Sequence, residues 1–91
     1  MVMREEKRGQ KRKKVNLPVT YVYSDERDPH LHKGITFDLC NTGMSFYTNK
    51  PLKEGLALRI QSLIWDSPKP CVIKWRSKKS RSIYKVGVFF R

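Results

Sequence analysis

The feature that most constrains the fold of this chain is an alternation of apolar and polar side chains in short segments, each ended by turn-forming residues. From 15 to 23 the odd positions are Val, Leu, Val, Tyr and Tyr. The same period of two occurs over 35–39, 44–48, 56–60, 71–76 and 83–90. This period is typical of β-strands with one buried face, whereas no segment shows the 3.6-residue period of an amphipathic helix. We therefore expect an all-β protein of six strands.

Turn signals between these segments indicate how the strands are connected. Asp28-Pro29 precedes the second segment, and Asn41-Thr42-Gly43 joins the second to the third in a turn where Gly43 is expected to take a positive φ. Pro18 lacks a backbone donor, so we expect an edge or a bulge at that position. Short strands at near-regular spacing favour a small, closed or nearly closed antiparallel β-barrel, because closure removes exposed edges. At 91 residues the chain has room for one such domain.

Positive charge is strongly concentrated at the amino end. The chain has 20 Lys and Arg against 8 Asp and Glu, for a formal net charge of +12. Residues 1–14 have no hydrophobic period, which predicts a flexible basic N-terminal arm followed by a barrel domain over 15–91. A polyanionic partner is the natural inference, and a merely solvated arm is the alternative.

The sequence favours a cytoplasmic protein that does not insert into a membrane. No apolar run approaches the roughly 20 residues needed to cross a bilayer, and the amino end is charged where a signal peptide would be apolar. Cys40 and Cys71 are too few for a disulfide framework and lack the spacing of a zinc site, so we expect free thiols.

Enzymatic and metal-dependent functions receive little support. Carboxylates and imidazoles gather in one polar loop, at Asp25, Asp28, His30 and His32. Because loops are generally rich in these residues and no second ligand pair follows, a surface turn is the better interpretation than a metal site. The sequence carries no nucleophile motif either, and we expect a protein that is not an enzyme.

Two short motifs, one on each side of the first strand, suggest a pocket for phosphate and guanine. Arg8 and Arg12 lie four residues apart in the arm, and a guanidinium can hold a phosphate or the O6 and N7 acceptors of guanine with two parallel donors. Asp38 lies at a strand end, where its carboxylate could accept from guanine N1 and N2. Position 40 would complete the site with a side-chain donor, and Gly43 would leave space for close backbone approach.

This pairing resembles the PilZ family, in which an R-x-x-x-R arm precedes a D-x-S-x-x-G turn. The arm here is Arg8 to Arg12, and the turn is Asp38-x-Cys40-x-x-Gly43. The resemblance continues over most of the chain, in the entry strand at 15–19, the Leu52-x-x-Gly55 connection, the Val72-x-x-Trp75 strand and the closing segment 86–90.

The resemblance implies a bacterial receptor for the second messenger cyclic di-GMP, with nucleotide binding and no reaction. By that analogy Arg8 and Arg12 would grip phosphates and guanine faces, while Asp38, Cys40 and Gly43 would hold a guanine edge. The arm would become ordered around the ligand and signal to a protein partner. The remaining candidates for ligand contact are Arg4, Asn41 and Trp75. For Trp75, on a strand, packing in the core is favoured over stacking on a base.

The sequence departs from the family pattern in two ways. Cys40 stands where the family has Ser, and a thiol is a bulkier and weaker hydrogen-bonding group, so binding should be weakened by of order 1 kcal/mol rather than abolished. The chain also ends at Arg91 directly after the last strand, so we expect no C-terminal helix.

Two other functions remain open at this point. A basic barrel with aromatic strands also fits a single-stranded nucleic-acid-binding module, although Asp38 suits a guanine edge better than a phosphate track. A degenerate PilZ domain that binds a protein and no cyclic di-GMP is the other alternative, because Cys40 replaces the serine.

Overall fold

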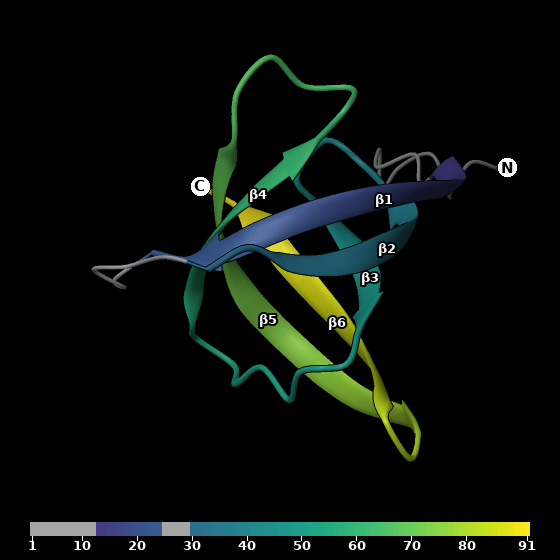
Figure 1. Cartoon of the computed structure of the whole chain (residues 1–91). Coiled ribbons are helices and arrows are strands. Elements are labelled where there is room, and N and C mark those ends of the chain that lie inside the picture. The colour runs from purple at the N-terminus through teal and green to yellow at the C-terminus, as the bar shows by residue number, and fades with distance from the viewer. Residues whose placement is uncertain (1–12, 25–29) are drawn as a thin grey trace, which may run out of the picture.

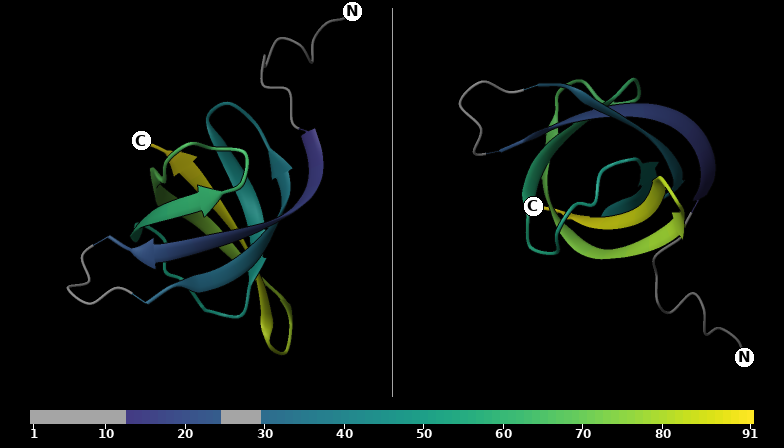
Figure 2. Two further views of the ribbon diagram at one scale, coloured as in Figure 1. Left: turned by 45° about the horizontal axis from the view of Figure 1, so that its top comes forward. Right: turned by 60° about the horizontal axis from the view of Figure 1, so that its bottom comes forward.

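The computed structural model describes residues 13–24 and 30–91, which form six strands in one closed ring (Figure 1). The strands are β1 (Lys13–Tyr23), β2 (His32–Leu39), β3 (Gly43–Thr48), β4 (Ala57–Ser62), β5 (Lys69–Ser80) and β6 (Ile83–Phe90). Each pairs with its neighbours in antiparallel fashion in the order β1-β2-β3-β6-β5-β4, and β4 closes the ring on β1 (Figure 2). The predicted all-β barrel is confirmed.

The core fills the inside of this ring, and most of its side chains come from the inward positions of the alternating segments. Its buried apolar members are Val19, Tyr21, Met44, Phe46, Leu52, Leu58, Ile60, Cys71, Ile73, Val86 and Val88. One polar pair is enclosed with them, where the Tyr21 hydroxyl lies 2.6 Å from Thr48 Oγ1. Burial raises the pKa of Tyr21 to about 12, because the phenolate would lose its hydration.

Strand ends differ from the sequence expectation mainly in β5. β6 has the predicted bounds, and β1 begins at Lys13, two residues before the expected start at Val15. β5 continues to Ser80 through a basic stretch that we expected to be a turn. Residues 74–80 are all exposed, so no alternation of burial marks them as strand; their pairing with β6 holds them in a two-stranded ribbon that extends beyond the barrel (Figure 1).

Bulges interrupt the strand pairing and decide which side chains face outward. The β1–β2 register shifts between Lys14 and Leu17, next to Pro18, where a bulge was one of the two expectations. The β2–β3 register shifts between Thr36 and Asp38. A bulged strand carries an extra residue, so the alternation of faces changes phase there.

The role expected for the backbone of Gly43 is wrong. Among the described residues only Gly55 has a positive φ, of 87°. Gly43 instead lies against the backbone of β6, where an added Cβ would overlap the carbonyl oxygen of Val88. Glycine is needed here for space rather than for an unusual conformation.

Candidate functional site

The turn between β2 and β3 is held both by its own hairpin and by β6. The Cys40 amide donates to the Gly43 carbonyl over 2.9 Å, so Asn41 and Thr42 form a two-residue connection. The Phe90 amide donates to the Thr42 carbonyl over 2.8 Å. The Cys40 Sγ atom is half-buried and lies 3.6 Å from Thr42 Oγ1. These contacts fix the backbone of the motif at one end of the barrel.

The N-terminal arm joins the barrel beside this turn. In the β1–β2 ladder Lys13 pairs with Leu39, and Lys14 pairs with Asp38. The first two residues of β1 therefore lie directly across from the residues that lead into the turn. Arg4, Arg8 and Arg12 fall outside the described residues, so their predicted roles stay predictions.

A buried threonine fixes the bulge that precedes Asp38. Thr36 is 1% exposed, and its Oγ1 lies 2.7 Å from the Ser45 carbonyl and 3.1 Å from the Asp38 carbonyl, each within donating distance. Asp38 pairs with Ser45, which alternates with the inward residues Met44 and Phe46 and so lies on the outer side of the sheet, although neighbouring side chains cover it to 4% exposure. Cross-strand partners share a face, and the Asp38 side chain is thus placed on the outer surface.

Strand register places Asp38 in one row with Trp75 on this outer surface. Ser45 pairs with Gly87 of β6, and Gly87 pairs with Trp75 of β5. Three strand spacings of roughly 4.8 Å separate the two ends of the row, or about 14 Å between their backbones. Two of the sequence candidates thus share a face, although they do not touch.

The favoured interpretation of Trp75 as a core residue is wrong. The register shift between Ile73 and Trp75 inserts Lys74 as an extra residue, which turns the following side chains to the opposite face. Trp75 is 37% exposed, and its indole covers Gly87, where an added Cβ would overlap the ring. Its outward position keeps it a candidate for contact with a ligand.

A cavity of about 510 Å³ opens at the same end of the barrel as the turn. Its lining is Lys13, Leu39, Cys40, Asn41, Trp65, Lys69 and Phe90. The Trp65 and Phe90 rings meet edge to face at 5.4 Å, and the Lys69 ammonium lies 5.3 Å from the Trp65 centroid and 5.7 Å from that of Phe90. Aromatic surface, two ammonium groups and an amide are therefore combined in one pocket, a chemistry suited to an anionic ligand with flat rings.

Trp65, Lys69 and Phe90 line this cavity, and sequence reasoning did not name them as candidates. Trp65 ends the 62–65 run, which does not alternate, so the local pattern does not indicate which way its side chain points. In the structure the Trp65 amide donates to the Ser62 carbonyl over 3.1 Å, and the Gln61 side chain donates to the Trp65 carbonyl over 3.2 Å. A tryptophan in a connection rich in turn residues, four residues before a lysine, was the available signal.

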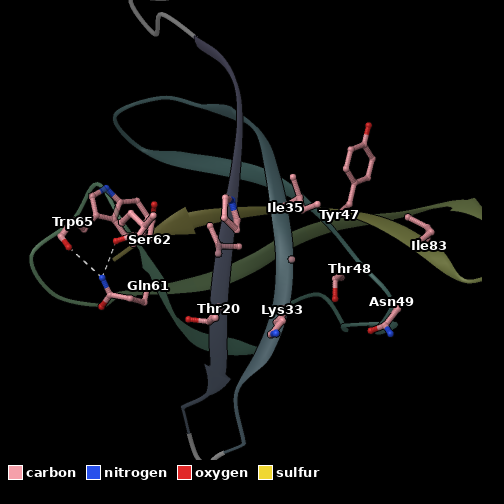
Figure 3. A pocket seen from close by; sticks show the side chains of 14 residues that line it. Thr20, Lys33, Ile35, Tyr47, Thr48, Asn49, Gln61, Ser62, Trp65 and Ile83 are labelled. Atoms are coloured by element: carbon pink, nitrogen blue, oxygen red, sulfur yellow. Dashed lines mark hydrogen bonds between the residues drawn. The ribbon is translucent and has the colours of Figure 1, made fainter.

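A larger cavity of about 800 Å³ runs across β1 and β2, as Figure 3 shows. Gln61 and Trp65 line one end, while Ile35, Tyr47 and Ile83 line the other. Its lining is mostly apolar, and Lys33 supplies the one ionisable cation among the described residues there. With a mostly apolar lining and a single cation, this cavity suits an anionic ligand less well than the 510 Å³ cavity does.

The structure adds little to the metal and membrane questions. Within residues 13–24 and 30–91 no cluster of three or more His, Cys, Asp and Glu is placed to hold a metal, while Asp25 and Asp28 lie outside those ranges. No helix in the described part of the chain has the length and apolar character to span a membrane.

Comparison with known proteins identifies the fold. No family model and no curated protein matches the sequence. Among solved structures, the PilZ domain of YcgR from Escherichia coli, with c-di-GMP, superimposes with a TM-score of 0.62 at 17% identity, over 89% of this chain and 75% of that one. The MrkH–c-di-GMP complex of K. pneumonia gives a TM-score of 0.66 at 14% identity, over all of this chain and 45% of that one.

The closed six-stranded ring therefore has a PilZ-like fold, as the sequence resemblance predicted. At these identities the likeness concerns the fold.

Proposed function

We propose that this protein is a receptor for cyclic di-GMP, which it binds at the β2–β3 turn with the help of the N-terminal arm. The observation that carries the proposal is the β1–β2 register, with Lys13 opposite Leu39 and Lys14 opposite Asp38. This register joins the arm that carries Arg8 and Arg12 to the barrel next to the Asp38 turn. Lys13 and Lys14, the described residues that follow the arm, lie on the same rim as the Asp38 turn, which supports a shared site for the two halves of the motif, separated by 25 residues of sequence.

The fold likeness supports the same ligand. Both structural neighbours were solved with c-di-GMP. The chemistry of the rim fits a cyclic dinucleotide, because Asp38 can accept from a guanine edge, the arginines can pair with phosphates, and Trp65 or Trp75 offers a ring for stacking.

We further propose that ligand binding orders the arm and that a protein partner reads the change. Ordering a segment costs conformational entropy, so part of the interaction energy with the ligand is spent on the arm. This mechanism needs no chemical step, and the protein would act as a binding adaptor rather than an enzyme.

Isothermal titration of cyclic di-GMP into the full chain tests the proposal, with GTP as the control ligand. The variant Arg8→Ala/Arg12→Ala should lose saturable binding. The matched control is Lys7→Ala/Lys11→Ala, which removes the same charge at the same spacing from the same arm. Equal losses in both variants would show that only the charge of the arm matters, and no heat with the unaltered protein would refute the receptor function.

Asp38→Asn separates the guanine contact from the phosphate contacts. An amide would offer guanine one acceptor instead of two carboxylate oxygens, so affinity should fall by roughly 1–3 kcal/mol, or about fivefold to 150-fold. Far-ultraviolet circular dichroism of the variant should remain that of the unaltered barrel, because Asp38 points outward.

A further inference from the structure

The second distinctive surface of the molecule is strongly basic, and the segment that forms most of it contains no acidic residue. From 69 to 91 the chain has eight cationic side chains and no Asp or Glu, the cations being Lys69, Lys74, Arg76, Lys78, Lys79, Arg81, Lys85 and Arg91. This segment is β5, β6 and the turn that joins them, which extends as a ribbon beyond the ring (Figure 1). The proposed cyclic di-GMP site uses little of it.

Several of these cations lie over aromatic rings. The pairs, measured from Nζ to ring centroid, are Lys74 over Phe89 at 4.1 Å, Lys79 over Tyr47 at 5.4 Å and Lys85 over Phe37 at 5.7 Å. The Phe37 and Tyr47 rings are themselves 4.5 Å apart. An ammonium over a ring face keeps its charge available to an anion, and the ring remains close to whatever the ammonium binds.

Strand register places these groups on one face. Val86 and Val88 are buried in the core, so Lys85, Gly87 and Phe89 of β6 point outward. Their partners on β3 and β5 share that face: Tyr47 pairs with Lys85, and Trp75 pairs with Gly87. Phe89 is 46% exposed, which is unusual for so large an apolar ring. We call this surface the basic ribbon face, and it consists of Phe37, Tyr47, Lys74, Trp75, Lys79, Lys85 and Phe89.

We propose that the basic ribbon face binds single-stranded nucleic acid. Proteins that bind single strands without strong sequence preference combine cations that follow the phosphates with aromatic rings on which bases stack. This face supplies both, and the rings alternate with the lysines rather than lying in the core. The inference does not depend on the cyclic di-GMP proposal, because the cations of this face lie on β5 and β6 rather than on the arm, although Trp75 is a candidate for both sites.

The arrangement fits a single strand better than a lipid surface. A membrane-binding face places aliphatic side chains among its cations for insertion into the acyl region. Within residues 13–24 and 30–91 the most exposed aliphatic side chains are Leu31, Leu63 and Ile64, at 71%, 87% and 53%. They lie in the connections before β2 and after β4, outside the basic ribbon face, although Ile35, the cross-strand partner of Tyr47, is 47% exposed beside it.

Fluorescence anisotropy with a labelled dT15 oligonucleotide tests the proposal on the full chain. Each phosphate contact should contribute about 0.7 to the slope of log affinity against log salt concentration. Lys74→Gln/Lys79→Gln should therefore reduce the slope by about 1.4. Lys53→Gln/Arg59→Gln is the matched control, with the same loss of charge at exposed positions outside the face, and should leave the slope unchanged.

Phe89→Leu tests the stacking part without a change of charge. Loss of one stacked base should weaken dT15 binding at least about fivefold while the salt slope stays the same. Since all variants retain the arm, its contribution is common to every measurement. Titration of cyclic di-GMP into the same variants distinguishes this proposal from the receptor function, because that affinity should not change.

Three results would overturn the proposal. The first is an unchanged affinity in Phe89→Leu together with the same salt slope in Lys74→Gln/Lys79→Gln and in Lys53→Gln/Arg59→Gln. Binding would then depend only on the overall charge of the protein. The second is equal or tighter binding of a dT15–dA15 duplex. The third is equally tight competition by polyglutamate, which would identify an acidic protein surface as the better partner.

Discussion

Gly43→Ala should destabilise the barrel substantially, although alanine is ordinarily a better strand residue than glycine. The added methyl group would overlap the Val88 carbonyl oxygen of β6. Because the obstacle is backbone, no side chain can rotate away, and β3 must separate locally from β6. Overpacking of this kind costs about 1–3 kcal/mol. Displacement of the alanine would also strain the backbone hydrogen bond from Cys40 to position 43, which would add about 1 kcal/mol.

Urea unfolding monitored by tryptophan fluorescence measures this cost, and we expect a loss of about 2–4 kcal/mol. A domain of this size has a total stability of roughly 5–14 kcal/mol, so the variant should still fold. Gly55→Ala is the contrasting control: no atom lies within 4 Å of its added Cβ, but its φ of 87° is unfavourable, and it should lose about 1–2 kcal/mol. A Gly43→Ala loss below about 0.5 kcal/mol would refute the argument from space and show that the turn moves freely relative to β6.

Two further predictions concern the cysteines. Cys40→Ser should tighten cyclic di-GMP binding by about fivefold in a calorimetric titration. The reason is that a hydroxyl is smaller and forms stronger hydrogen bonds than the thiol, which lies near Thr42. Unchanged affinity would show that the side chain at position 40 does not contact the ligand. In the native protein a thiol reagent should label Cys40 and spare Cys71, which is fully buried. Burial raises the pKa of the Cys71 thiol from 9.0 to about 12, so the folded state retains a proton that the unfolded chain loses. The contribution of this thiol to the free energy of unfolding should therefore be fully present below about pH 9 and be lost between pH 9 and 12. The free energy of unfolding should decline less steeply over that range in Cys71→Ala.

The sequence predicted the barrel because its inward positions alternate with polar ones, and burial enforces that alternation. For this reason the bounds predicted for the last strand agree with those of β6, Ile83–Phe90. The end of β5 could not be predicted in the same way, because residues 74–80 face solvent on both sides of a ribbon and carry no period. Their strand conformation depends on pairing with β6, which is a tertiary interaction.

Bulges explain the errors at the candidate site. Lys74 shifts the phase of β5, and the outward position of Trp75 follows from that one extra residue. Nothing in the local sequence marks it, since Ile73 and Trp75 continue the apolar alternation. Trp65, Lys69 and Phe90 of the 510 Å³ cavity are brought together by closure of the strand ring. Local sequence patterns could not predict this proximity either. By contrast, the order of the two motifs predicted that the arm and the Asp38 turn lie near each other. The β1–β2 pairing, in which Lys14 lies opposite Asp38, is consistent with that prediction.

The two proposed anion sites adjoin each other, and this limits how they can influence one another. Phe89 of the basic ribbon face pairs with Gly43 of the β2–β3 turn, where we propose that cyclic di-GMP binds. Two unit charges 10 Å apart in water repel by about 0.4 kcal/mol, and physiological salt screens this over about 8 Å. Charge repulsion between cyclic di-GMP and a bound oligonucleotide should therefore weaken each by less than about tenfold, equally in both directions. A larger effect, or stronger oligonucleotide binding in saturating cyclic di-GMP, would require the arm to contact both ligands, and Arg8→Ala/Arg12→Ala would then abolish the coupling.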